Sequence, residues 1–149
     1  MTDPAGLTKF FEGDRFASRN GMRMAEVRTG YARAEMAVEE GHLNTVAILH
    51  GGALFTLADF AFAAACNSHG VVAVACQADM TYFKGIAEGA RITAVAEEIS
   101  RTRKLSTCVV RLTDESGELV ALFKGVAYIK GTPLPLRNPA DAASEEAGH

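Results

Sequence analysis

The chain has 149 residues, a formal net charge of −3 at pH 7, and 48% hydrophobic residues. This length suits one domain, and without a visible basic stripe we expect no nucleic-acid partner. No uninterrupted apolar stretch reaches the roughly 18 residues of a membrane span, and residues 1–4 lack the pattern of a secretory signal. We therefore expect a cytoplasmic protein with no membrane association.

The first predicted element is a short helix over about residues 7–20. Within this region Asp14 can cap a short helix that runs to Arg19, and Gly21 can end it. From Met22 the pattern changes to the alternation of strands, with Thr29-Gly30 as the hairpin turn between two of them. The apolar residues at roughly helical spacing are Leu7, Phe10, Phe11, Phe16 and Ala17.

A central helix is predicted over about residues 51–67, directly after His50-Gly51-Gly52. It is so apolar that we expect it to be buried on most sides. Asp59 lies in the middle of this run, and a buried carboxylate is costly to ionise unless something pairs with it or uses it. Asp59 is thus either a structural hydrogen-bond acceptor or a working group, and we favour the second interpretation.

The rest of the chain is predicted to form four long strands joined by tight turns. Because no βαβ alternation follows the helix, we expect an α+β fold with a curved antiparallel sheet around one long central helix. We expect a single domain over residues 1–131 and a flexible tail over residues 132–149. The predicted strands are Val71–Phe83, Arg91–Ser100, Lys104–Thr113 and Glu118–Lys130.

Such a sheet has two open edges, and pairing with a second copy would protect one, so we predict a homodimer. The dimer also bears on chemistry. Asp59 follows Gly51 by eight residues, which is ~12 Å along a helix axis and too far to act on a carbonyl held at the same Gly51. If two helices lie antiparallel across the dimer, each Asp59 could face the Gly51 of the other chain.

The start of the central helix suits an oxygen ligand. Unpaired N–H groups and a partial positive charge gather there, and glycines let a ligand oxygen approach the main chain. Gly51 and Gly52 could therefore polarise a carbonyl, or they could simply form a tight strand-to-helix turn. Asn44 could orient a water or a carboxylate, and His50 could hold the turn, although a local loop hydrogen bond would explain either residue.

The remaining polar residues give weaker signals. The hydroxyls of Ser68 and Thr81 could line a pocket. We interpret the three cysteines, Cys66, Cys76 and Cys108, as reduced buried thiols. The four histidines show no metal-ligand spacing, so we expect neither a metal nor a cofactor.

Two segments resemble a known family. The first segment reads His50-Gly51-Gly52-Ala53-Leu54-Phe55-Thr56-Leu57-Ala58-Asp59 and is followed by Ala65-Cys66-Asn67-Ser68. It resembles the HGGxxFxLAD…CNS pattern of the hydroxyphenylacetyl-CoA thioesterase (PaaI-like) branch of hotdog-fold thioesterases. Tyr82-Phe83-Lys84 and Leu122-Phe123-Lys124-Gly125 are similar to two further segments of that family. The similarity spans about residues 14–130, with Gly85 in place of the usual proline and Ala90 in place of a frequent Asp.

The resemblance implies a hotdog fold, dimers that often pair into tetramers, and hydrolysis of an acyl-CoA thioester, such as an aryl-acetyl-CoA, to a free acid and CoA. Asp59 then matches the catalytic carboxylate, acting as general base or nucleophile, and Gly51 matches the glycine whose N–H polarises the carbonyl. His50 and Asn44 match residues that shape the site. Candidate CoA-phosphate contacts are Lys84, Arg91, Arg101, Arg103 and Lys104.

Two other functions remain open from the sequence. A dehydratase acting on 3-hydroxyacyl thioesters could use the same fold, with His50 and Asp59 reaching one β-carbon. A non-catalytic acyl-CoA binding module is the second alternative. A comparison of CoA release from acyl-CoA with turnover of enoyl-CoA would separate these functions.

Overall fold

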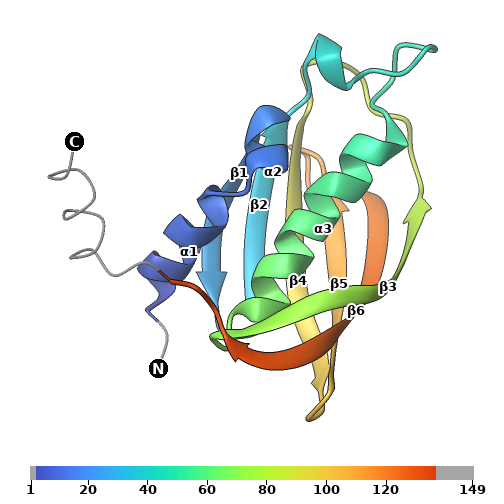
Figure 1. Ribbon diagram of the computed structural model, residues 1–149. Helices are drawn as coiled ribbons and strands as arrows, with labels where there is room; N and C mark the ends of the chain where they lie inside the picture. The colour runs from blue at the N-terminus through green and yellow to red at the C-terminus, as the bar shows by residue number, and fades with distance from the viewer. Residues whose placement is uncertain (1–2, 137–149) are drawn as a thin grey trace, which may run out of the picture.

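The structure, a computed structural model, describes residues 3–136 (Figure 1). One antiparallel sheet of six strands, in the order β1-β2-β4-β5-β6-β3, curves around a long helix, α3 (Gly51–Asn67). This arrangement confirms the predicted α+β fold and the bounds of the central helix. The strands are β1 (Met22–Arg28), β2 (Tyr31–Ala37), β3 (Val71–Tyr82), β4 (Arg91–Arg101), β5 (Leu105–Thr113) and β6 (Leu119–Pro133).

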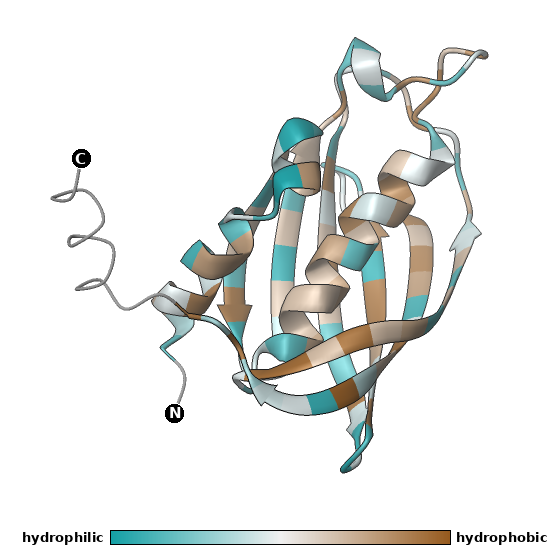
Figure 2. Ribbon diagram, viewed as in Figure 1, coloured by the Kyte–Doolittle hydropathy of each residue, from teal (hydrophilic) through white to brown (hydrophobic). Residues whose placement is uncertain are grey.

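Helix α3 lies against the concave side of the sheet, and Figure 2 shows few hydrophilic segments along it. Its alanines let the strands approach closely, because Ala58, Ala61 and Ala65 have 1% or less of their surface exposed. Larger side chains need matching space: a Cβ at Gly125 of β6 would lie 2.8 Å from Cζ of Phe62. Glycine at this position lets β6 pass over the ring of a core phenylalanine.

The N-terminal region forms two helices, not the single helix expected over about residues 7–20. Helix α1 spans Pro4–Glu12 and α2 spans Arg15–Arg19. Asp14 lies between them in an extended conformation (φ −65°, ψ 112°), and its carboxylate accepts a 3.0 Å hydrogen bond from the N–H of Ala17. The predicted cap at Asp14 is thus confirmed, and because a capping residue is not helical, it interrupts the longer helix.

The two edges of the sheet differ. Helix α1 packs along edge strand β1 (Figure 1), and the N–H of Val27 donates a 3.2 Å hydrogen bond to Oγ1 of Thr8 in α1. Edge strand β3 has no such cover among the described residues, and side chains such as Val74 (42%) and Tyr82 (48%) are exposed. The described part of the chain therefore protects one edge of the sheet and leaves the other open.

The boundary between domain and tail lies later than residue 131. Strand β6 continues to Pro133, which pairs with Val71, and the N–H of Leu134 donates a 3.0 Å hydrogen bond to the carbonyl of Gly70. The prediction of a flexible tail from residue 132 is thus wrong for its first residues, because Gly70 and Val71 offer them backbone partners. The remainder of the predicted tail, residues 137–149, lies outside the described residues.

The cysteines confirm two buried thiols and correct the third. Burial raises the pKa of Cys66 to about 12 and that of Cys108 to about 11, so both are inert at neutral pH. Cys76 is exposed, because it lies on edge strand β3 where the pairing with β6 is irregular. Within residues 3–136, no helix is long and apolar enough to cross a membrane.

Candidate active site

The start of α3 is built around His50, its N-cap. The Nδ1 atom of His50 accepts a 2.8 Å hydrogen bond from the N–H of Gly52, so the ring proton of the neutral imidazole is on Nε2. A Cβ on Gly52 would lie 2.9 Å from this Nδ1, so a larger residue could not take its place without moving the ring. The sequence suggested that His50 could hold the turn, and this contact does so.

Gly51 is the first residue of α3, and its surroundings explain why it is a glycine. A Cβ there would lie 3.3 Å from Cζ of Tyr82, whose hydroxyl donates a 3.1 Å hydrogen bond to the carbonyl of Gly51. The first N–H groups of a helix have no partner within the helix and lie at its positive end. An electron-rich oxygen, such as that of a polarised carbonyl, is therefore stabilised at this end of α3.

Asp59 lies on the one face of α3 that the sheet leaves uncovered. Gly52, Thr56, Asp59 and Ala63 follow one another at three- or four-residue spacing and are all at least partly exposed, and we call them the outer stripe of α3. Among the described residues, none forms a hydrogen bond or an ion pair with the Asp59 carboxylate. The residue is therefore not a structural acceptor within one chain.

Two effects raise the pKa of Asp59 above its ordinary value of 3.8. Burial is the larger, because partial removal from water disfavours the charged form, and the negative charge of Asp14 adds to it. A carboxylate with a raised pKa is a stronger base than one in water. Asp59 is thus a partly desolvated acid with no partner in residues 3–136, which is typical of a working group.

One chain does not bring Asp59 and Gly51 together. Both belong to the same straight helix, and eight residues separate them by ~12 Å along its axis. Within residues 3–136, nothing covers the outer stripe or the open β3 edge.

Asn44 lies in the loop that precedes His50. Its Oδ1 accepts hydrogen bonds from the N–H groups of Val46 (3.1 Å) and Ile48 (3.3 Å), and Leu43 and Leu49 form a short bridge across the loop. Asn44 thus shapes the approach to the helix start through its own loop. These contacts match the local hydrogen bonding that the sequence left open as an alternative to direct chemistry.

The predicted substrate-binding hydroxyls lie in different places. Ser68 is fully buried at the far end of α3, where its hydroxyl donates to the carbonyl of Ala65 and accepts from the N–H of Gly30, both at 2.7 Å. These contacts join the β1–β2 hairpin to the helix end and favour a structural role. Thr81 is exposed on β3, directly before Tyr82, and so lies near the helix start.

The candidate phosphate contacts do not converge on one point of the chain. Lys84 pairs with Glu118 at 2.7 Å and with Asp114 at 3.0 Å, and these hydrogen bonds raise its pKa. Its charge is therefore already neutralised. Arg91 begins β4, whereas Arg103 lies in the turn that follows β4, so roughly 30 Å of strand separates these two exposed residues.

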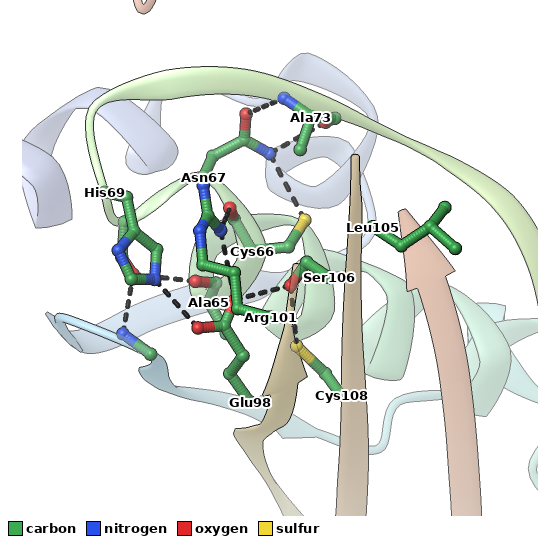
Figure 3. Close-up of polar contacts among 12 residues, drawn as sticks. Ala65, Cys66, Asn67, His69, Ala73, Glu98, Arg101, Leu105, Ser106 and Cys108 are labelled. Atoms are coloured by element: carbon green, nitrogen blue, oxygen red, sulfur yellow. Dashed lines mark hydrogen bonds and ion pairs between the residues drawn. The ribbon is translucent and has the colours of Figure 1, made fainter. Parts of the chain in front are cut away.

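Sequence reasoning missed a buried polar network beneath the other end of α3. Glu98 accepts hydrogen bonds from Nε2 of His69 (2.8 Å), from Nη1 of Arg101 (3.1 Å) and from Ser106, as Figure 3 shows. Burial opposes its ionisation, but these hydrogen bonds prevail and hold the pKa of Glu98 below its ordinary value of 4.5. The alternation of inward and outward side chains along β4 could have indicated this network. Glu98 is the next inward position after Ala94 and Ala96, so its carboxylate would need buried partners.

Tyr82 is the second residue that was missed as a site residue. In the sequence it stands between Thr81 and Phe83 at the end of an apolar strand, where no pattern indicates a contact with Gly51 31 positions earlier. No group of three or more His, Cys, Asp or Glu residues in the described part of the chain could hold a metal ion.

Comparisons with known proteins agree on one family, the thioesterases. Residues 47–121 match the model of the Thioesterase superfamily. The acyl-coenzyme A thioesterase PaaI of Escherichia coli is 33% identical over 123 residues, which cover 82% of this chain and 88% of that protein. The solved structure of the Escherichia coli PaaI protein from the phenylacetic acid degradation operon has a TM-score of 0.82 at 30% identity, covering 87% of this chain and 94% of that one. A single-residue variant of the phenylacetic acid degradation protein PaaI from Thermus thermophilus has a TM-score of 0.75 at 38% identity, covering 77% and 98%.

Proposed function

Because this chain belongs to the thioesterase superfamily and is a PaaI-like hotdog hydrolase, we propose that it hydrolyses an acyl-CoA thioester with Asp59 as the catalytic carboxylate. The relative of 33% identity whose name states this activity supports the substrate class. The observation that carries the residue assignment is the partly buried Asp59 on the outer stripe of α3, which has a raised pKa and no partner in the described part of the chain.

The second part of the site is the start of α3. The N–H of Gly51 donates to the thioester carbonyl oxygen, and the positive helix end stabilises the negative charge that develops there when the carbonyl carbon is attacked. Gly51 and Asp59 are ~12 Å apart in one chain. We therefore assign each site to two chains, in which the Asp59 of one protomer faces the Gly51 of its partner.

The open edge of the sheet supports this dimer. Strand β3 exposes its backbone edge and contacts α3, whereas the opposite edge is covered by α1. Edge pairing of two β3 strands about a twofold axis perpendicular to both β3 and α3 would set two copies of α3 side by side and antiparallel. In that arrangement the open edge of β3 and the outer stripe of α3 both become part of the dimer interface.

The reaction consumes one water and releases the acid and the CoA thiol. Asp59 either deprotonates the water that attacks the carbonyl carbon, or attacks the carbon itself to give a mixed anhydride that water then cleaves at the Asp59 carbonyl. A single turnover in ¹⁸O-water separates the two routes. The first places solvent oxygen in the acid product, and the second places an oxygen of Asp59 there.

The proposed function is tested by measuring thiol release from acyl-CoA compounds, with an enoyl-CoA as the control for dehydratase chemistry. We expect thiol release from wild type and about 10³-fold slower release from Asp59→Asn. Binding of acyl-CoA without thiol release in wild type would instead identify a binding module.

The two-chain site is tested by co-expressing Asp59→Asn with Gly51→Val. A hybrid dimer then contains one site with both an intact Asp59 and an intact Gly51, so we expect activity to reappear although each variant alone is inactive. The matched control is a co-expression of two differently tagged Asp59→Asn chains, which stays inactive. Failure of the hybrid dimer to recover activity would place both residues of a site in one chain.

A further inference from the structure

We propose that Tyr82 is a positioning residue that, through the peptide group between Gly51 and Gly52, holds His50 with its Nε2–H available as a second donor to the substrate carbonyl. This inference rests on the proposed function, because it adds a donor beside the N–H of Gly51. It concerns a hydroxyl on strand β3 that neither the sequence pattern nor the comparisons assign.

The argument begins with one peptide group that is hydrogen-bonded at both ends. Its carbonyl, that of Gly51, accepts from the hydroxyl of Tyr82 at 3.1 Å, and its N–H, that of Gly52, donates to Nδ1 of His50 at 2.8 Å. Hydrogen bonds in such a chain polarise and strengthen one another. The Tyr82 hydroxyl therefore strengthens the bond that holds the imidazole.

Packing fixes the same three groups. A Cβ on Gly51 would lie 3.3 Å from Cζ of Tyr82, and a Cβ on Gly52 would lie 2.9 Å from Nδ1 of His50. The two rings thus occupy the spaces where side chains would stand at these positions. The two glycines therefore let both rings contact one peptide group. This role is separate from letting a ligand approach the main chain.

Tyr82 is itself held by the sheet. It is the last residue of β3 and pairs with Ala121, which is fully buried in β6, while the next residue, Phe83, donates its N–H to the carbonyl of Val120 at 2.9 Å. The hydroxyl therefore projects from a backbone that is fixed on one side. The first turn of α3 is thereby tied to the edge strand that the proposed dimer would cover.

The consequence for His50 concerns its tautomer. Nδ1 can accept from Gly52 only when it carries no proton, so the neutral ring must carry its proton on Nε2. The Nε2–H of an imidazole points away from Nδ1, and His50 is exposed, so this donor is directed out of the helix start. Loss of the Tyr82 hydroxyl weakens the Gly52 bond and lets the other tautomer and other ring orientations populate.

The test is Tyr82→Phe, which keeps the ring and removes only the hydroxyl. We expect kcat to fall roughly 2- to 10-fold, the factor that matches one hydrogen bond, with KM unchanged. In ¹⁵N-histidine spectra, with His50 assigned from the spectrum of His50→Asn, we expect a smaller fraction of the Nε2–H tautomer. The amide of Gly52 should also exchange its hydrogen faster than in wild type.

The matched control is Tyr128→Phe, which removes a hydroxyl from another half-exposed tyrosine; of the described residues, only Lys104 contacts that hydroxyl. We expect wild-type kcat and an unchanged His50 spectrum. The proposal is overturned if Tyr82→Phe has wild-type kcat, if only KM changes, or if kcat falls while the His50 tautomer and Gly52 exchange stay as in wild type. The spectra do not depend on turnover. A failure of the proposed function, which would be seen as an active Asp59→Asn variant, is therefore distinguishable from a failure of the positioning role of Tyr82.

Discussion

The two carboxylates associated with α3 have opposite environments. Asp59, on the outer stripe, has no hydrogen-bond or ion-pair partner among the described residues, and burial raises its pKa. Glu98, beneath the end of the helix, has three partners, and its pKa is lowered (Figure 3). A charge that costs stability is retained for function, whereas a fully satisfied charge serves the fold. Chemistry on this helix is therefore expected at the outer stripe, where Asp59 lies.

The largest expected effect is that of Asp59→Asn on turnover. We expect kcat to fall by about 10³-fold, because the amide can neither take a proton nor attack the carbonyl. Stability should not fall, since a raised pKa means that the ionised carboxylate costs folding free energy at neutral pH. Steady-state kinetics and thermal unfolding of the same preparation check both parts. If the variant kept its turnover, or if its unfolding temperature were well below that of wild type, Asp59 would not differ from Glu98 in the way described.

Lowering the pH should affect activity, through Asp59, and stability, through Glu98, in different pH ranges. Activity requires ionised Asp59, so kcat/KM should decline as the pH falls through a pKa above 3.8. Glu98 has a lowered folded-state pKa, so its stabilisation is complete above 4.5 and is lost as the pH falls through that lower value. We therefore expect activity to disappear at a higher pH than the stability that Glu98 provides. The checks are a pH–rate profile and unfolding temperatures over the same pH range.

Glu98→Gln should have the next largest effect, on stability. The change removes the charged acceptor of Arg101, whose side chain is only partly exposed, and we expect a loss of about 2 kcal/mol in the free energy of unfolding. Turnover per folded molecule should be retained, because the network is at the far end of the helix from Gly51. Denaturant unfolding and active-site-normalised rates measure the two quantities. A wild-type midpoint would show that the network contributes no stability.

The smallest expected effect is that of His50→Ala on the helix start. Loss of the Nδ1 acceptor leaves the N–H of Gly52 without its cap, and we expect about 1 kcal/mol less stability. His50→Asn is the matched control, since asparagine is a favourable N-cap and should recover that stability. Denaturant unfolding of the two variants decides the matter, and equal destabilisation of both would contradict the capping role.

Local pattern predicted much of this fold. The bounds of α3 and the antiparallel strands followed from apolar runs and turn residues, because these features depend on near neighbours in the chain. The N-terminal helices show the limit of such reasoning, since apolar spacing extended across Asp14 although its capping conformation interrupts the helix. The candidate site was predicted in part: Asp59 stood out as a charge in an apolar run, and its uncovered position agrees with that interpretation.

Other features depend on residues far apart in the sequence. The contact between Tyr82 and Gly51 exists because β3 ends beside the start of α3, and no local pattern encodes it. The neutralisation of Lys84 by Asp114 and Glu118 likewise depends on how two turns meet.

Hydrophobic periodicity and an isolated charge are properties of consecutive residues, so the amino-acid sequence alone predicts which elements form and that Asp59 is anomalous. Only the tertiary structure decided which face of α3 stays uncovered, which edge of the sheet stays open, and which carboxylate is satisfied. The physical reason is that burial and hydrogen bonding depend on distances between segments, which are fixed when the sheet closes around the helix.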